Sequence, residues 1–361
     1  MKPFLTRPPF FCVVLTIGFV GSILTFLFFS QEERSKEISL PLLDASTSET
    51  FFRHPLSGEK WETPKENPFV FSVMVENSAD AWPLSGLGEA FLVIEAPVEG
   101  NIPRFIAFYS QETEEKKIGP VRSARLYYLD WANEFNALYA HVGGSPEALE
   151  KIRSGNIFDL NEFYQAPIFW RSSDRYVPHN TYTSSFLLNH FLLIQQEQGK
   201  APEPVYEHLN FKEDDPSALT SESITGIQTH FSSSYLYDVT WQYEPEINRY
   251  RRFQAGKDAG ILAHETSLLA NNVVFLITDI RTIDGVGRKA IRTLGEGDAV
   301  ILQDGRIIEG YWKKSSADTR LCFYDENNDE IKWNAGKTWI EIVSSKDDLS
   351  LLMQEERFTS E

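Results

Sequence analysis

Residues 117–145 read KIGPVRSARLYYLDWANEFNALYAHVGGS. A Gly-Pro pair near the start predicts a turn, because both residues favour turn conformations. Residues 126–135 have the spacing of an amphipathic helix, and the apolar run 137–142 predicts a buried strand. Turn, helix, strand and a second turn therefore follow one another in one compact unit.

Two arginines and a glycine turn lie at the ends of this unit. Arg122 and Arg125 follow the first turn, and Gly143, Gly144 and Ser145 begin a second helix. Guanidinium groups and the free N–H groups of a helix N-terminus both bind anions. We expect these residues to contact an anionic or sugar-like ligand. The structural alternative is that the arginines pair with the protein's own acids and carbonyls.

The N-terminus predicts a membrane anchor over residues 1–30. An uncharged run begins at Phe10 and ends at Phe29, and about 20 helical residues span roughly 30 Å, the thickness of a hydrocarbon core. No small-residue cleavage pattern ends this run, which favours an uncleaved signal anchor over a cleaved signal peptide. We expect a single-pass protein of the cytoplasmic membrane, with its body on the extracytoplasmic side.

Charge and cysteine content narrow the class further. The formal net charge is −18 over 361 residues, and no basic tract is present, so we expect no nucleic-acid partner. The two cysteines, Cys12 and Cys322, lie far apart, and we expect no disulfide framework.

Beyond the anchor the chain divides by composition into a stalk, two domains, a linker and a tail. The expected bounds are 31–66 for the polar stalk, 67–199 for a mixed α/β domain, 200–225 for the linker, 226–345 for a β-rich domain and 346–361 for a polar tail. The fold class is therefore α+β, with the second domain forming a small barrel or sandwich.

Within these domains the periodicity predicts individual elements. Expected strands of the first domain are 69–75, 90–94 and 105–109, and its later helices are 146–153 and 183–198. Expected strands of the second domain are 235–243, 249–253, 273–277, 299–303, 306–309, 321–324 and 338–343. An Asp-Gly pair at 304–305 predicts a hairpin between two of them.

Several sequence motifs resemble those of a known family and occur in the same order. They are PLSG (55–58), WPLSGLGEA (82–90), VEG (98–100) with Arg104, IGPVRSAR (118–125), HVGGSP (141–146), PHNTYTS (178–184), RYRR (249–252), DGRIIEGYW (304–312) and GKTWIEI (336–342). The chain thereby resembles the YerB-like family of bacterial cell-envelope lipoproteins, a two-domain family of unassigned biochemical function. The resemblance implies a place outside the cytoplasmic membrane. The lipid-modified cysteine typical of the family is lacking here, and the apolar run 10–29 replaces it.

A second polar group lies in RSSDRYVPHNTYTS, residues 171–184. Arg175, His179 and Asn180 belong to an expected irregular loop, and loops with many hydrogen-bonding groups often carry function. His141 lies at a strand end, where site residues are also common. We expect all four to line the ligand site, with a satisfied core histidine as the structural alternative for His141.

Three side chains are candidates for acid-base catalysis. Glu99, Asp159 and His179 could act in hydrolysis of a glycosidic bond if two of them faced each other across a cleft. Their separation is not fixed by the sequence, and surface acids are commoner than catalytic ones. Whether the protein is an enzyme stays open.

Other chemistries lack their motifs. HExxH and Cys/His clusters are absent, so we expect no metal site, and the absence of GxxxxGK[ST] and of a glycine-rich βαβ unit gives no reason to expect a cofactor. Our preferred hypothesis is a membrane-anchored protein that binds a cell-wall glycan or peptide or another envelope ligand. The alternatives are a cell-wall hydrolase and a scaffold that docks an envelope protein partner.

Overall fold

The structure is a computed structural model that describes residues 51–353 except 64, 156, 216–223, 264 and 266. The expected membrane anchor, most of the stalk and the residues after 353 lie outside this range. Among the described residues, none of the helices is both long and apolar enough to cross a membrane.

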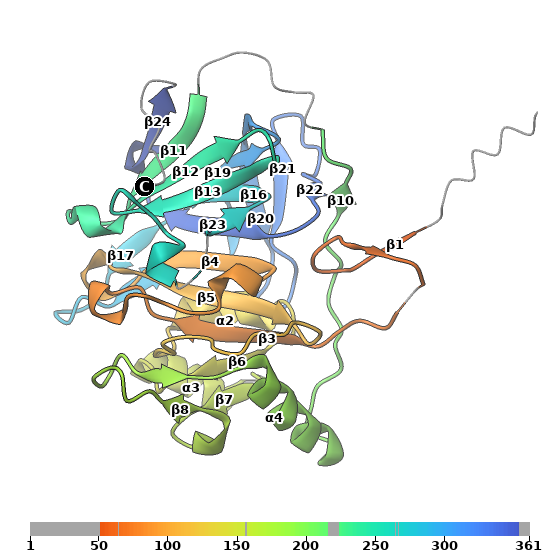
Figure 1. The fold of residues 1–361 in the computed structure, drawn as a ribbon, viewed down its shortest axis with the longest axis vertical. Helices are drawn as coiled ribbons and strands as arrows, with labels where there is room; N and C mark the ends of the chain where they lie inside the picture. The colour runs from red at the N-terminus through yellow and green to blue at the C-terminus, as the bar shows by residue number, and fades with distance from the viewer. Residues whose placement is uncertain are drawn as a thin grey trace, which may run out of the picture. The chain divides into compact units, whose positions relative to one another are not determined.

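The central sheet has ten strands, which come from both the N-terminal and the C-terminal parts of the described chain. Its order is β21-β20-β19-β16-β23-β4-β5-β3-β6-β7. The N-terminal strands are β3 (Val70–Val75), β4 (Leu92–Pro97), β5 (Pro103–Ser110), β6 (Leu138–His141) and β7 (Asp159–Asn161). The C-terminal strands are β16 (Asn272–Ile277), β19 (Gly295–Gln303), β20 (Arg306–Lys314), β21 (Cys322–Asp325) and β23 (Thr338–Val343). Figure 1 shows the later strands, in teal and blue, continuing the sheet of the earlier ones, in orange and yellow.

A second, six-stranded sheet packs on one face of the first. Its path is β14-β13-β12-β11-β24, with β15 paired to β13. The strands are β11 (Ile224–His230), β12 (Asp238–Glu244), β13 (Arg249–Gln254), β14 (Lys257–Asp258), β15 (Leu269–Ala270) and β24 (Leu349–Met353). The C-terminal strands are thus shared between two layered sheets, which corrects the expectation of a separate small barrel or sandwich. The expected polar tail also begins with a strand, since β24 pairs with β11.

Helices cover the central sheet where the second sheet does not. They are α2 (Leu126–Asn133), α3 (Pro146–Ser154) and α4 (Ser185–Glu197). Ser145 and Ser184 cap α3 and α4 by accepting hydrogen bonds from Ala148 N–H and Leu187 N–H, which confirms the expected start at residue 146 and places the other two residues after the expected 183. Rings of α2 pack in a core on one face of the sheet, and Trp241 and Trp339 pack in another core between the two sheets.

The remaining elements are short. Paired strands are β1 (Phe52–Arg53) with β2 (Lys60–Trp61), β8 (Trp170–Arg171) with β9 (Thr181–Tyr182), β10 (Phe211–Lys212) with β22 (Trp333–Asn334) and β17 (Ile280–Thr282) with β18 (Lys289–Ile291). Short 3-10 turns lie at Ala79–Ala81, Leu87–Glu89, Glu99–Asn101, Ala166–Ile168, Tyr235–Tyr237, Ile261–Ala263 and Lys346–Asp348.

Candidate functional site

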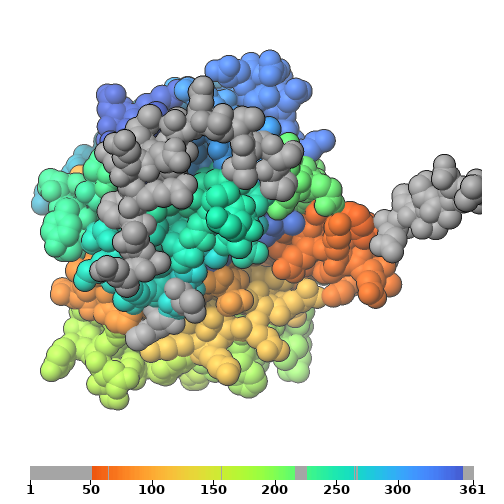
Figure 2. Space-filling view, turned by 45° about the horizontal axis from the view of Figure 1, so that its top comes forward, coloured from red at the N-terminus to blue at the C-terminus, as the bar shows by residue number. Residues whose placement is uncertain are grey.

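A cavity of about 890 Å³ is lined by segments within residues 54–115 and within residues 249–337. We call it the acidic hollow. Its lining residues are His54, Ser57, Glu59, Gly88, Glu89, Ala90, Phe91, Ser110, Glu112, Thr113, Glu114, Glu115, Arg249, Glu265, Ser267, Leu269, Asn271, Gly336 and Lys337. In Figure 2 the segment around β1 and β2, in orange, lies beside the teal residues of the second sheet, and the loop between β1 and β2 contributes to this lining together with residues of β13 and β15.

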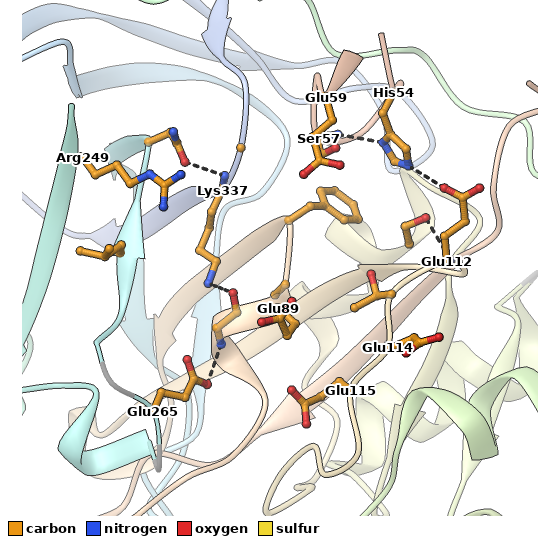
Figure 3. A pocket seen from close by; sticks show the side chains of 18 of the residues that line it. His54, Ser57, Glu59, Glu89, Glu112, Glu114, Glu115, Arg249, Glu265 and Lys337 are labelled. Carbon is orange, nitrogen blue, oxygen red and sulfur yellow. Dashed lines mark hydrogen bonds and ion pairs between the residues drawn. The ribbon is translucent and has the colours of Figure 1, made fainter. Parts of the chain in front are cut away.

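Carboxylates dominate the lining of the acidic hollow. Figure 3 shows them around the cavity with two cationic side chains, Arg249 and Lys337, among them. The six acids are Glu59, Glu89, Glu112, Glu114, Glu115 and Glu265. Across the described residues no group of three or more His, Cys, Asp or Glu side chains is arranged to hold a metal ion. The lining thus has more carboxylates than cationic side chains.

Lys337 and Glu265 are fixed on one turn of the wall. Lys337 Nζ donates to the Leu87 carbonyl at 2.7 Å and to the Gly88 carbonyl at 2.5 Å, and Gly88 N–H donates to Glu265 Oε1 at 2.7 Å. Burial lowers the pKa of Lys337 to about 8 and raises the pKa of Glu265. Perturbed groups of this kind in a cavity are typical of functional sites.

His54 is held in its neutral form at the opposite wall. Its Nδ1 accepts from Leu56 N–H at 3.2 Å and from Ser57 N–H at 3.1 Å, and its Nε2 lies 3.7 Å from Glu112 Oε2. Burial lowers the pKa of His54, although Glu112 opposes this shift. The imidazole therefore shapes the wall without adding a positive charge.

The residues predicted from the sequence lie elsewhere, and most are paired with the protein's own groups. Arg122 Nε lies 3.2 Å from Glu76 Oε1, and His179 Nδ1 lies 2.9 Å from Glu76 Oε2. Glu76 is almost fully buried, with a side chain only 5% exposed. One carboxylate thus holds two of the predicted ligand-binding residues in place.

Arg125 and Glu99 form a two-point ion pair. Arg125 Nε donates to Glu99 Oε1 at 2.8 Å, and Arg125 Nη2 donates to Glu99 Oε2 at 2.7 Å. Burial raises the pKa of Glu99, but the hydrogen bonds and charge of Arg125 outweigh it, so the net shift is downward. Glu99 is therefore an ionised partner of Arg125, and the structural alternative describes this pair.

His141 and the glycine turn are also bound internally. His141 is fully buried, with Nε2 2.7 Å from Asp159 Oδ1 and Nδ1 2.7 Å from the Gly143 carbonyl. Gly143 has a φ of +58°, which favours glycine. A Cβ on Gly144 would lie 3.0 Å from the Ala124 side chain, so this turn is packed closely against the segment that precedes α2.

A second cavity, of about 620 Å³, collects other predicted residues. We call it the aromatic hollow; its lining consists of Asp80, Trp82, Pro83, Lys117, Asp174, Arg175, Tyr176 and His179. Arg175 donates to the carbonyls of Ala81 and Pro83, and Asn180 accepts from Arg171 Nη1 at 3.2 Å beside it. The structure thus places Arg175 and His179 in this lining, but not Arg125, His141, Gly143, Glu99 or Asp159.

The acidic hollow was missed by the sequence reasoning because its residues are spread over the chain. Gly88 and Glu89 fall in WPLSGLGEA, Arg249 in RYRR, and Lys337 in GKTWIEI, all words that carry the family resemblance. The pairing of strands that are distant in the sequence brings these residues together. The residue spacing within a single motif does not indicate this pairing.

Comparison with known proteins defines the family. Residues 56–199 match the N-terminal domain, and residues 227–340 the C-terminal domain, of the family described as protein of unknown function DUF3048. The chain belongs to this two-domain, YerB-like family, which confirms the resemblance.

The chain is similar to YerB of Bacillus subtilis both in sequence and in structure. "Putative lipoprotein YerB" of strain 168 is 29% identical over 299 residues, which covers 82% of this chain and 88% of that protein. The crystal structure of YerB protein is similar with a TM-score of 0.72 and 28% identity, and the match covers 83% of this chain and 99% of that one.

Proposed function

We propose that the protein is an envelope-attached, extracytoplasmic binding protein whose acidic hollow takes up an ammonium-bearing cell-wall ligand. The Bacillus relative is named a putative lipoprotein, which supports attachment to a membrane. The apolar run 10–29 supplies a means of attachment in this chain. The observation that carries the ligand proposal is the lining of the 890 Å³ cavity, where six carboxylates face two cationic side chains.

Electrostatics select the ligand class. With His54 neutral, the lining has more carboxylates than cations, and a cavity lined by one sign of charge concentrates ions of the opposite sign. Glu89 and Glu114 are exposed and free to pair with ammonium groups at the mouth of the cavity. A free amine of a wall peptide or of an amino sugar has this charge.

The cationic side chains of the lining bear on a second group of the ligand, a carboxylate. Lys337 is committed to two backbone carbonyls, whereas Arg249 is exposed and has no ion-pair partner within the described residues. Arg249 is therefore placed to bind a carboxylate, because a guanidinium binds it through two parallel hydrogen bonds. A wall peptide fragment with both an amine and a carboxylate fits this arrangement.

Calorimetric titration with purified wall peptides tests the proposal. A chain that begins at Phe51 should bind them, and the double variant Glu89→Gln with Glu114→Gln should bind about threefold to tenfold more weakly, since exposed charge pairs contribute about 0.5 kcal/mol or more each. Glu246→Gln, an exposed acid outside the hollow, is the matched control. Equal affinity of the double variant and the control would contradict the assignment.

The aromatic hollow supports a second candidate ligand, a wall glycan. Tyr176 is 91% exposed and lies in the same lining as Trp82 and His179, and exposed rings beside hydrogen-bonding side chains bind sugar rings by stacking. Of the predicted site residues, this lining contains Arg175 and His179. Tyr176→Ala should abolish glycan binding while Tyr164→Ala, a similarly exposed ring outside the lining, leaves it unchanged.

The alternative of a wall hydrolase has less support. Glu99 is held by Arg125 and Asp159 by His141, so neither carboxyl faces another across a cavity. A scaffold role remains the outcome if neither a wall peptide nor a glycan binds.

A further inference from the structure

Three ionisable side chains are buried in the core between the two sheets. Glu95 lies on β4, Glu341 on β23 and Arg252 on β13. Glu95 and Glu341 are register partners on neighbouring parallel strands, and both side chains are fully buried. They lie three or four residues beyond Phe91, Arg249 and Lys337, so the three strands that carry them begin at the acidic hollow.

Glu95 is saturated by donors. Arg252 Nη2 donates to both carboxylate oxygens of Glu95 at 2.9 Å, and Trp339 Nε1 donates to Oε2 at 3.1 Å. Asn77 Nδ2 adds a contact to Oε1 at 3.4 Å. Glu95 therefore has the partners that a buried carboxylate needs to stay ionised beside its arginine.

Glu341 has fewer partners. Trp241 Nε1 donates to Glu341 Oε1 at 2.7 Å, but the buried Oε2 atom has no hydrogen-bond partner. The Thr229 hydroxyl on β11 faces this carboxyl without closing a hydrogen bond of good geometry. A carboxylate with one oxygen unsatisfied in a dry core costs several kcal/mol, whereas a protonated carboxyl could donate from that oxygen.

The charges around Glu341 do not balance. The charged groups that face it are Glu95 from β4 and Arg252 from β13; its other neighbours, Trp241 on β12 and Thr229 on β11, are neutral. One guanidinium cannot compensate two carboxylates. Burial, with the neighbouring Glu95 charge, raises the pKa of Glu341 to about 8, and burial also raises the pKa of Glu95.

We propose that the Glu95–Glu341 pair retains one proton at neutral pH, carried by Glu341, and that this proton stabilises the packing of the second sheet on the central sheet. When the proton leaves to solvent, two carboxylates and one guanidinium remain in the core, and the contact between β13 and the β4–β23 pair weakens. The inference is independent of the ligand in either hollow.

Chemical unfolding at a series of pH values tests it. Glu341 has a folded pKa above its unfolded value, so its stabilising contribution is full below about pH 4.5 and is lost as the pH rises through about 8. The wild-type denaturation midpoint should therefore fall between pH 6 and pH 9. Glu341→Gln, which imitates the protonated carboxyl, should match the wild type at pH 6 and keep its midpoint at pH 9.

Two matched variants make the result specific. Glu95→Gln should lower the midpoint at both pH values, because it removes the carboxylate that pairs with Arg252. Glu265→Gln, a half-buried acid of the hollow with a raised pKa, should leave the stability loss caused by Glu341 between pH 6 and pH 9 unchanged. Infrared difference spectra at pH 6 should show a protonated-carboxyl band in the wild type that Glu341→Gln lacks.

The proposal is overturned if Glu341→Gln destabilises the protein at pH 6 as much as Glu95→Gln does, or fails to fold. It is equally overturned if the wild type and Glu341→Gln lose the same stability between pH 6 and pH 9, or if their infrared spectra have the same carboxyl band.

Discussion

At the scale of single residues, Glu76 decides the role of two side chains that the sequence singled out. Arg122 and His179 were expected to bind a ligand, and both contact the Glu76 carboxylate. The sequence places Glu76 at the end of an apolar strand, where nothing indicates that it meets residues about 50 and 100 positions later. Residue types and loop context predicted a polar cluster, but the partner that satisfies it comes from tertiary packing.

Glu76→Gln should therefore destabilise the protein by about 2 kcal/mol, because it leaves Arg122 without its buried anion. The difference in unfolding free energy from urea titration measures this cost. Glu246→Gln should change the unfolding free energy by less than about 0.5 kcal/mol. If the two variants are equally stable, the Glu76 ion pair contributes nothing to stability.

Lys337 gives a pH dependence of the opposite sign to that of Glu341, at higher pH. Its folded pKa of about 8 lies below its unfolded value, so the unfolded chain binds more protons between about pH 8 and pH 10.5, and the contribution of Lys337 to stability rises with pH there. Lys337→Met should remove about 1 to 2 kcal/mol of this rise, as measured by the difference between wild-type and variant unfolding curves. An unchanged difference across the window would show that Lys337 titrates normally.

At the scale of elements, the sequence predicted which segments fold but not how they pair. The helix start at Ser145 followed from local capping signals and was confirmed, whereas the helix expected from residue 183 begins after its cap at Ser184. The run 273–277 is entirely apolar, which is typical of a strand buried on both faces. That signal should have excluded a small barrel with one solvated face. It could not indicate that β23 would lie between β4 and β16, because sheet order depends on long-range contacts.

A substitution at Gly226 tests the pairing of β11 with β12, because Gly226 lies close to the β12 backbone. A Cβ added there would lie 1.8 Å from the Trp241 carbonyl oxygen, a backbone atom that cannot move aside. Gly226→Ala should destabilise the protein by about 2 to 3 kcal/mol in thermal or urea unfolding. Gly285→Ala, where a Cβ meets nothing within 4 Å, should be neutral, and equal losses in both variants would contradict the strand contact.

At the scale of the whole molecule, the two family domains share one sheet. The boundary predicted near residues 200–225 separates the two matched family regions, yet β23 of the second pairs with β4 of the first. A chain ending at residue 215 leaves the buried edge of β4 without its partner, and an open apolar edge favours aggregation. It should lack a cooperative unfolding transition by circular dichroism, whereas a chain from Phe51 to the C-terminus has one. A stable, monomeric 51–215 chain would show that the shared sheet is dispensable.

The most direct test of the proposed binding function compares one wall peptide in two forms, with its amine free and with the same amine acetylated. Calorimetric titration of both into the wild-type chain from Phe51 isolates the ammonium charge, because acetylation removes it and leaves the rest of the peptide unchanged. We predict binding of the free-amine form that weakens with added salt, and a loss of at least tenfold on acetylation. Equal binding of the two forms, or none of either, would contradict the assignment of the acidic hollow.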